Sequence, residues 1–340
     1  MDGFLDTVPA DGTGSRDVAA EQRLGLSDMR TLVTGGAGFI GSHVTDALLA
    51  NGDEVVVLDD LSRGRPGRVD PSVTVYKADI SDADALRSAV ERARPQVICH
   101  LAAQIDVRVS VEAPAMDAAI NVVGTVNVLE AARAVGARVL FASTGGAIYG
   151  AGVPVPASED EQPGPEAPYG TAKYCAEQYL GLYNRLYGTA HVALRLANVY
   201  GPRQDPTGEA GVVGIFCNRA LGGERPTVFG DGAQTRDYVY VGDVAEAFLA
   251  AARTGKPGVW NIGTSVETSV LELIDVVGRA AGRTLEPEFV PARPGEVLRS
   301  ALAVERARAD LGWSAHTELA DGVREVYRWI EAASPDRAGR

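Results

Sequence analysis

Short β-branched runs alternate with longer segments of helical periodicity between residue 30 and about residue 200. The runs are TLVT at 31–34, EVVVL at 54–58, VTVY at 73–76, QVICHLA from 96, RVLFAS at 138–143 and HVALRLA at 191–197. The periodic segments predict helices that end near residue 49, span 82–93 and 112–135, and follow residue 168. Strands that alternate with helices pair in parallel through right-handed crossovers. The pattern therefore predicts an α/β fold built on a doubly wound parallel sheet.

The regular alternation of strands and helices ends after GPRQDP at 201–206. The short strands TVFG, DYVYV and GVWNIG interleave with helices predicted near 243–253, 268–281, 303–311 and 317–333. We interpret residues 30–200 as one domain and residues 201–333 as a smaller mixed α/β lobe, with segments after residue 230 partly returning to the first domain. The polar, acidic residues 1–29 are expected to form a disordered N-terminal tail, and residues 334–340 a second tail.

Composition and charge exclude several classes of protein. Hydrophobic residues make up 46% of the chain and charged residues 23%, which is enough to bury a core. A net charge of -13 argues against nucleic acid as a partner, because that binding depends on basic surface. Three cysteines without CxxC spacing and four scattered histidines indicate neither a disulfide framework nor a metal site. We find no basic leader and no run of roughly 18 apolar residues, so we expect a cytoplasmic protein with no membrane partner.

The first predicted strand leads directly into TGGAGFIG, where Gly35, Gly38 and Gly41 recur at a spacing of three. Glycines between a strand and a helix allow a tight turn and the close approach of a pyrophosphate to the amides of the helix N-terminus. The spacing alone is common in a chain with 39 glycines, so its position between strand and helix is what indicates a dinucleotide site.

Acidic residues follow the next two predicted strands. EVVVL ends at Asp59 and Asp60, whose carboxylates can accept hydrogen bonds from an adenosine ribose and repel a 2′-phosphate. This favours NAD over NADP, although Arg63 and Arg65 could bind that phosphate. Asp79, in ADIS, follows the third strand, where it either meets the adenine amino group or caps the helix that begins near residue 82.

The stretch PYGTAKYCAE, residues 168–177, carries Tyr169 and Lys173 one helical turn apart, so both project from the same face. Only three lysines occur among the 32 Lys and Arg residues, which indicates that this position needs a compact ammonium. A neighbouring ammonium lowers the pKa of a phenol and so favours its use as a base. Ser143 and Thr144, at a predicted strand end, are candidate hydroxyls for the reacting oxygen or else simple turn residues.

Eight motifs occur in a fixed order: TGGAGFIG, DDLSRG, ADI, HLAAQ, STGGAIYG, YGTAK, LRLANVYGP and RDYVYV. Over about residues 30–333 they resemble the extended short-chain dehydrogenase/reductase family, and within it the NAD-dependent nucleotide-sugar epimerases and dehydratases of the UDP-galactose 4-epimerase type. The resemblance implies a Rossmann domain, tightly bound NAD, a UDP-sugar substrate and 4-epimerase activity. It also implies a homodimer formed through the predicted helices at 112–135 and 168–187.

The same resemblance implies roles for individual residues. Tyr169 would act as the base, Lys173 as its partner, and a hydroxyl of the STGG segment as the third catalytic group. Cofactor contacts are implied for Gly35, Gly38, Phe39, Ile40, Gly41, Asp59, Asp60, Ser62, Arg63, Gly64, Asp79, Ile80, Leu101, Ala102, Ala103, Gln104, Asn121, Tyr169 and Lys173. Substrate contacts are implied for Asn198, Val212, Val213, Phe229, Arg236, Arg293, Glu296 and Ser300.

The STGG segment departs from the commonest family form, which places Ser or Thr four residues before Tyr149, where this chain has Gly145. We therefore assign the third catalytic role to Thr144, with Ser143 in reserve. The dehydratases and decarboxylases of this family carry acidic residues immediately after that hydroxyl, whereas this chain has Gly145 and Gly146. The favoured reaction is therefore inversion at C4 through a transient 4-keto sugar.

The choice of sugar leaves alternatives open. Ser300, at the position of the family's size gate, implies room for UDP-N-acetylhexosamines as well as for UDP-glucose and UDP-galactose. A UDP-glucuronate 4-epimerase or decarboxylase is the nearest alternative, because Arg203 could face a carboxylate, although Asp205 would oppose one. A redox-sensing binding protein without chemistry is disfavoured by the intact pair of Tyr169 and Lys173.

Overall fold

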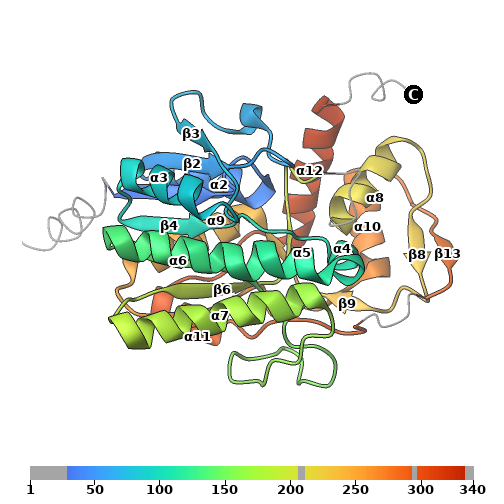
Figure 1. Cartoon of the computed structure of the whole chain (residues 1–340). Helices are drawn as coiled ribbons and strands as arrows, with labels where there is room; N and C mark the ends of the chain where they lie inside the picture. The colour runs from blue at the N-terminus through green and yellow to red at the C-terminus, as the bar shows by residue number, and fades with distance from the viewer. Residues whose placement is uncertain (1–28, 206–210, 293–296, 334–340) are drawn as a thin grey trace, which may run out of the picture.

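A seven-stranded parallel sheet forms the centre of the molecule (Figure 1), and the computed structural model describes residues 29–205, 211–292 and 297–333. The strands are β1 (Arg30–Thr34), β2 (Glu54–Asp59), β3 (Thr74–Lys77), β4 (Val97–His100), β5 (Arg138–Thr144), β6 (Val192–Leu196) and β11 (Gly258–Ile262). Their order is β11-β6-β5-β4-β1-β2-β3, so the direction of winding reverses between β1 and β4. Ligands of open parallel sheets bind beyond the carboxyl ends of the strands at such a reversal.

Helices cover both faces of this sheet and build the smaller lobe. They are α2 (Phe39–Ala50), η1 (Pro66–Arg68), α3 (Ala83–Ala93), α4 (Val107–Glu112), α5 (Pro114–Ala118), η2 (Ala119–Val123), α6 (Gly124–Val135), α7 (Pro168–Tyr187), α8 (Val212–Leu221), α9 (Val241–Arg253), α10 (Val270–Ala280), α11 (Glu305–Leu311) and α12 (Leu319–Ala333). α2, α9 and α11 pack on one face, and α3, α6 and α7 pack on the other, where α6 and α7 run side by side (Figure 1). The doubly wound architecture predicted from the sequence is confirmed.

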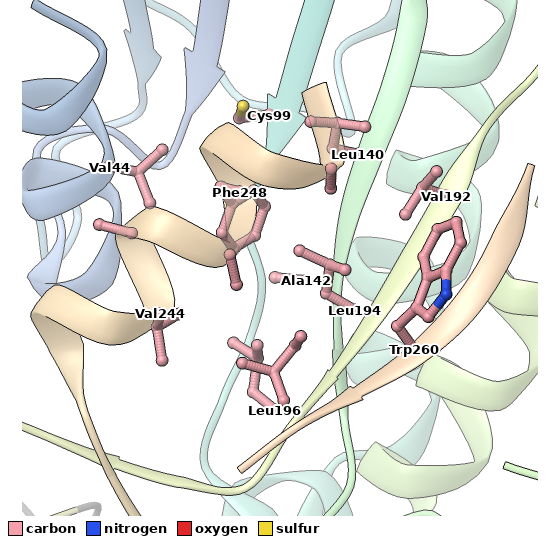
Figure 2. Packing of buried hydrophobic residues seen from close by; sticks show 14 of the residues in the cluster. Val44, Cys99, Leu140, Ala142, Val192, Leu194, Leu196, Val244, Phe248 and Trp260 are labelled. Carbon is pink, nitrogen blue, oxygen red and sulfur yellow. The ribbon is translucent and has the colours of Figure 1, made fainter. Parts of the chain in front are cut away.

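Alternation along the strands supplies the two hydrophobic cores. In β5, Leu140 belongs to the core beneath α2 and α9, whereas Phe141 belongs to the core beneath α3, α6 and α7. Figure 2 shows Phe248 of α9 among side chains that include Val44, Cys99 and Leu140. Because both faces are buried, these strands carry nearly continuous apolar runs, as parallel strands require.

A third hydrophobic core lies inside the smaller lobe, where α8, α10 and α12 pack together. Its short strands are β7 (Asn198–Tyr200), β8 (Thr227–Phe229), β9 (Thr235–Arg236), β10 (Tyr238–Tyr240), β12 (Thr268–Ser269) and β13 (Glu288–Val290). β10 pairs in parallel with β7, and β8 pairs in parallel with β13, whereas β9 and β12 are antiparallel. β11 lies at the edge of the main sheet beside β6, and α9 packs on α2, so both segments after residue 230 belong to the large layer.

The helix predicted from about 112 to 135 is confirmed from Pro114 to Val135, and a separate short helix, α4, precedes it. α4 ends at Glu112, and a second helix starts at Pro114, because proline lacks the amide that would continue the first helix. This second helix runs to Val135 through the π-helical turn η2. By length and a mean hydropathy of 1.2 it could cross a membrane, but α6 packs against α3, α7, β4 and β5, as a core helix does.

Candidate active site

The glycine turn after β1 depends on close backbone contacts. Gly35 has a φ of +70°, and a Cβ on it would lie 2.7 Å from the amide nitrogen of Ala102. A Cβ on Gly41 would lie 2.1 Å from the carbonyl oxygen of Gly35, so any side chain there forces helix and turn apart. Gly38 is the N-cap of α2 and offers no side-chain cap, and the first turn contains no acidic residue. The helix N-terminus is therefore suited to an anion and fits the pyrophosphate of a dinucleotide.

Asp59, at the carboxyl end of β2, is buried and braces the same turn. Its Oδ2 accepts a hydrogen bond from the Ala37 amide at 3.0 Å, and its Oδ1 accepts one from the Leu61 amide at 2.9 Å. Burial raises the pKa of this carboxyl group. A Cβ on Gly64 would lie 2.5 Å from Oδ1, so the loop can approach only with glycine there. Both oxygens retain lone pairs for further donors, and the ribose contact stays a prediction.

The other predicted adenosine contacts lie around this strand end. Asp60 Oδ1 accepts hydrogen bonds from the amide and hydroxyl of Ser62, and Arg63 is exposed beside them. Asp79 accepts a hydrogen bond from the Ser81 amide, while Asp82 caps α3. The alternative that Asp79 caps this helix is therefore wrong, and its contact with adenine stays a prediction. Ile80 is buried, and a Cβ on Gly124 would lie 2.8 Å from its side chain.

The loop after β4, Leu101 to Gln104, joins the glycine turn to α5 and η2. The Ala102 amide donates to the Thr34 hydroxyl at 3.2 Å. The Gln104 amide donates to Asn121 Oδ1 at 3.0 Å, and Asn121 Nδ2 donates to the Gln104 carbonyl at 2.9 Å. Both side-chain amides also donate to Asp117 Oδ1, at 2.8 and 2.9 Å. Asp117 is absent from the residues predicted from the sequence, where its only signal is its place one helical turn before Asn121.

α7 brings Tyr169 and Lys173 to the carboxyl end of β5. Lys173 is buried; its Nζ donates to the Ala142 carbonyl at 2.9 Å and lies 4.6 Å from the centre of the Phe141 ring. The centre of the Tyr169 ring lies 6.0 Å from the same Nζ. The Tyr169 amide donates to the hydroxyl of Ser110 on α4 at 3.2 Å, which gives α7 the N-terminal acceptor that its own N-cap residue lacks.

Desolvation controls the titration of this pair. Burial of the Tyr169 hydroxyl, together with the charge of Asp117, raises its pKa to about 12 against an opposing effect of Thr144. Burial lowers the pKa of Lys173 to about 8, against the opposing effects of Asp117 and Glu177. The expectation that the neighbouring ammonium lowers the pKa of the phenol is wrong for the protein without cofactor, because Lys173 directs this group to Ala142 and Phe141 and the pKa of Tyr169 is raised.

Thr144 and Ser143 have different partners at the end of β5, since neighbouring residues of a strand point to opposite faces. Thr144 lies beside the Tyr169 hydroxyl, whose pKa it lowers. The Ser143 hydroxyl donates to Glu177 Oε1 at 2.5 Å inside the protein. The structure therefore favours Thr144 over Ser143 as the third catalytic residue, and this role stays a prediction.

A buried ion pair that the sequence analysis does not predict anchors α7. Arg195 Nη2 lies 2.7 Å from Glu177 Oε2, and both side chains are almost fully buried. Arg195 Nη1 donates to the Tyr149 hydroxyl at 2.9 Å, and that hydroxyl donates to Asn261 Oδ1 at 2.8 Å. The network joins α7, β6 and β11 to the segment after β5. Its sequence signal is the position of Glu177 one turn after Lys173.

The glycine pair after Thr144 lies against the predicted substrate residues. A Cβ on Gly145 would lie 2.3 Å from the Leu302 side chain, and one on Gly146 would lie 3.4 Å from Asn198 Oδ1. Ser300 lines a small cavity together with both glycines. Asn198 and Ser300 are therefore neighbours of the catalytic turn.

The remaining predicted substrate residues lie in the smaller lobe. Val212 and Val213 are the first residues of α8, whose N-cap offers no side-chain hydrogen bond, so their amides suit a diphosphate. Phe229 ends β8, and Arg236 in β9 donates to the Thr235 carbonyl at 2.8 Å. Arg293 and Glu296 lie outside the described residues.

Among the described residues, Asp243, Glu246 and His316 bring their metal-ligating atoms within 4.8 Å of one another. Asp243 Oδ2 accepts hydrogen bonds from the His316 and Thr317 amides at 3.3 and 3.1 Å, and Oδ1 accepts one from the Thr317 hydroxyl at 2.9 Å. These contacts hold the chain before α12 against α9, which explains the cluster without an ion.

Replacing Gly41 with alanine should abolish retention of the dinucleotide and lower the free energy of unfolding by about 1 to 3 kcal/mol, because the new methyl group overlaps the Gly35 carbonyl. Bound nucleotide released by denaturation and urea unfolding measure the two effects. Gly67→Ala is the matched control, since a Cβ on this exposed glycine meets no atom within 4 Å. Equal nucleotide content in the two variants would contradict the assignment of the turn.

Comparison with known proteins identifies the family. A model of the NAD dependent epimerase/dehydratase family matches residues 31–263. The UDP-glucose 4-epimerase of Mycolicibacterium smegmatis is 48% identical over 313 residues, which cover 90% of this chain and 100% of the relative. The UDP-glucose 4-epimerase of Thermotoga maritima, crystallised with UDP-glucose, has a TM-score of 0.88 and 44% identity, covering 90% of this chain and 99% of that one.

The UDP-glucose 4-epimerase of Thermus thermophilus, solved in complex with NAD, has a TM-score of 0.85 and 44% identity, covering 90% of this chain and 100% of that one. The family match includes the glycine turn, β5 and the helix with Tyr169 and Lys173. The chain therefore belongs to the NAD-dependent epimerase/dehydratase family of enzymes, with NAD as its cofactor.

Proposed function

We propose that this enzyme is a UDP-hexose 4-epimerase that inverts C4 through a transient 4-keto sugar. The observation that carries the proposal is the placement of Tyr169 and Lys173 at the end of β5 beside Thr144, next to a turn with no acidic side chain at Gly145 and Gly146. The relatives named UDP-glucose 4-epimerase support the same reaction. Separate incubation with UDP-glucose, UDP-N-acetylglucosamine and UDP-glucuronate, followed by separation of the C4 epimers, tests it.

Each catalytic side chain has a defined task in this reaction. Tyr169 takes the proton of the C4 hydroxyl and returns a proton to the same oxygen after the sugar has turned, while Thr144 hydrogen-bonds that oxygen. Lys173 donates one ammonium proton to Ala142, and its other two suit the ribose hydroxyls of the cofactor. Bound NAD would supply the hydride acceptor and donor for C4, and its cationic ring would favour the phenolate of Tyr169.

Packing of the glycine pair supports epimerisation over dehydration. Dehydration needs an additional acidic group close to C5 and C6 of the sugar. The Leu302 side chain already fills the space that a Cβ on Gly145 would enter. A carboxylate at this position would require Leu302 to move, so the chain has neither the acid nor the room for it.

The alternative substrate, UDP-glucuronate, needs a cation for its carboxylate. Arg203 was the candidate cation, and its Nη2 lies 2.7 Å from Asp46 Oδ2 on α2. Because the charge of Arg203 is already paired with Asp46, this arginine would bind a sugar carboxylate less strongly. This supports a neutral hexose as the substrate.

A homodimer is the remaining part of the proposal. Val111, Met116 and Val123 are exposed on α4, α5 and η2, next to an apolar groove between η2 and the start of α7. A second copy of the same helices would bury this surface. The cytoplasmic location and the absence of a membrane partner stay predictions.

Tyr169→Phe should retain bound NAD but lose about 10²- to 10⁴-fold in kcat, because the acid–base hydroxyl is removed while the ring remains. Epimer formation and nucleotide released on denaturation measure both properties. Tyr174→Phe is the control, because Tyr174 lies on the same helix five residues after Tyr169, and this variant should remain active. A fully active Tyr169→Phe would remove the basis of the mechanism.

Ser300→Tyr should lose activity on UDP-N-acetylglucosamine by at least about tenfold relative to UDP-glucose, because the larger side chain fills the cavity beside the glycine pair. kcat/KM for both sugars measures the selectivity, with Ser300→Ala as the control that keeps the cavity open. An equal loss for both sugars would show that Ser300 is not the size gate.

Val123→Glu should convert the dimer to a monomer. Burying an unpaired carboxylate in an apolar interface makes the free energy of association much less favourable. Sedimentation velocity measures the mass, and Val266→Glu is the matched control, since the two valines are 53% and 59% exposed on different elements. A wild-type monomer, or an unchanged mass for Val123→Glu, would contradict the proposed interface.

A further inference from the structure

Asp117 is a fully buried carboxylate with one unpartnered oxygen. It lies on α5, which packs against α7, and it lines the same groove as Pro168 and Ala172 of that helix. Its Oδ1 accepts hydrogen bonds from the Gln104 and Asn121 side chains at 2.8 and 2.9 Å, whereas its Oδ2 has no partner among the described residues. Burial of such a group is costly, so its position beside the catalytic helix calls for an explanation.

A second carboxylate near Lys173 is arranged differently. Glu177 pairs with the buried Arg195 guanidinium at 2.7 Å and accepts the Ser143 hydroxyl. Its charge is therefore shared between Arg195 and Lys173, whose pKa it also raises. Asp117 accepts only from uncharged amides, and no ion pair with it is formed in the described part of the chain. Its negative charge is therefore left to act on the groups around it.

The titratable groups on the elements packed against α5 differ in their exposure. They are Tyr169, Lys173, Tyr174, Cys175, Glu177, Tyr179, Tyr183, Arg185 and Tyr187 of α7, Asp106, Arg108 and Glu112 of α4 and its N-cap, and Glu166 in the loop before α7. Water screens the exposed Arg108, Glu112 and Glu166. The two groups that respond to Asp117 are the catalytic ones, since its charge raises the pKa of both Tyr169 and Lys173.

We propose that Asp117 is a positioning residue whose unpaired negative charge keeps Lys173 protonated and keeps the proton on Tyr169 until substrate and cofactor are in place. The amides of Gln104 and Asn121 hold the carboxylate at this location without cancelling its charge. The π-helical turn η2 follows Asp117 directly, and such turns are frequent at functional sites. The inference rests on the proposed function of Tyr169 and Lys173 as the proton-transfer pair.

The sign of the effect follows from electrostatics. A buried anion stabilises a neighbouring ammonium and opposes the formation of a neighbouring phenolate, so removing it lowers the pKa of both groups. Lys173 would then lose its proton well below pH 8, and the phenolate of Tyr169 would form at lower pH than in the wild type. The pH range of activity would move to lower pH at both ends.

Asp117→Asn is the informative change, because the asparagine oxygen can keep both hydrogen bonds made by Oδ1. The chain has only three lysines, so NMR of protein labelled at lysine Nζ gives three titrating signals, assigned with Lys77→Arg and Lys256→Arg. We expect the Lys173 midpoint to fall by about one pH unit, with the signals of the exposed Lys77 and Lys256 identical in both proteins. Asp117→Ser should show the same shift if the asparagine variant does not fold.

Asp243→Asn is the matched control, because Asp243 is also buried but holds the chain before α12. It should lower stability without moving the Lys173 midpoint. The pH profile of epimerisation is the second readout, with a shift to lower pH of about one unit expected for Asp117→Asn. A Lys173 midpoint that stays or rises, or an activity loss equal at every pH, would overturn the inference. A wild type without epimerase activity but with the expected midpoint shift would refute the proposed function alone.

Discussion

The burial of the Lys173 ammonium beside β5 is the constraint that the rest of the site serves. A charge taken out of water is tolerated only where protein groups replace the lost hydration. Those groups here are the Ala142 carbonyl, the face of the Phe141 ring and the carboxylates of Asp117 and Glu177. They come from β5, α5 and α7, so these elements must keep their relative positions. The contact between Tyr169 and Thr144 depends on the same arrangement.

Close backbone contact is the second requirement, and glycine meets it at three places around the sheet ends. Gly35 and Gly41 bring the turn after β1 against the Leu101–Gln104 loop and the start of α2. Gly64 allows the loop after β2 to reach Asp59. Gly145 admits the Leu302 side chain from the segment that carries Ser300, which couples the catalytic turn to the substrate side. A side chain on any of these glycines would overlap its neighbour. Because glycine has none, the space and the backbone amides at these places stay accessible to a ligand.

Two buried polar residues attach the segment that carries Ser300 to the large domain. Asp237 accepts the Leu302 amide at 3.2 Å and the Thr264 hydroxyl at 2.6 Å. Asn261 donates to the carbonyls of Ala157 and Ala303 and accepts from Tyr149, which also contacts Arg195. The ion pair that orients α7 is therefore continuous with the contacts that hold the proposed size gate. A change in either would be felt at the other, because their partners are shared.

The sequence by itself determined the order and type of the main elements and the helical pairing of Tyr169 with Lys173, because periodicity and spacing are local properties. It also indicated a dinucleotide through glycines placed between a strand and a helix, and NAD through the acidic residues that follow the next strand. Helix α8, the hydrogen bond of Ser143 to Glu177 and the burial of Asp117 were decided only by tertiary structure. These features depend on contacts between side chains that are far apart in the sequence. The raised pKa of Tyr169 belongs with them, because desolvation depends on everything packed around the hydroxyl rather than on the lysine one turn away.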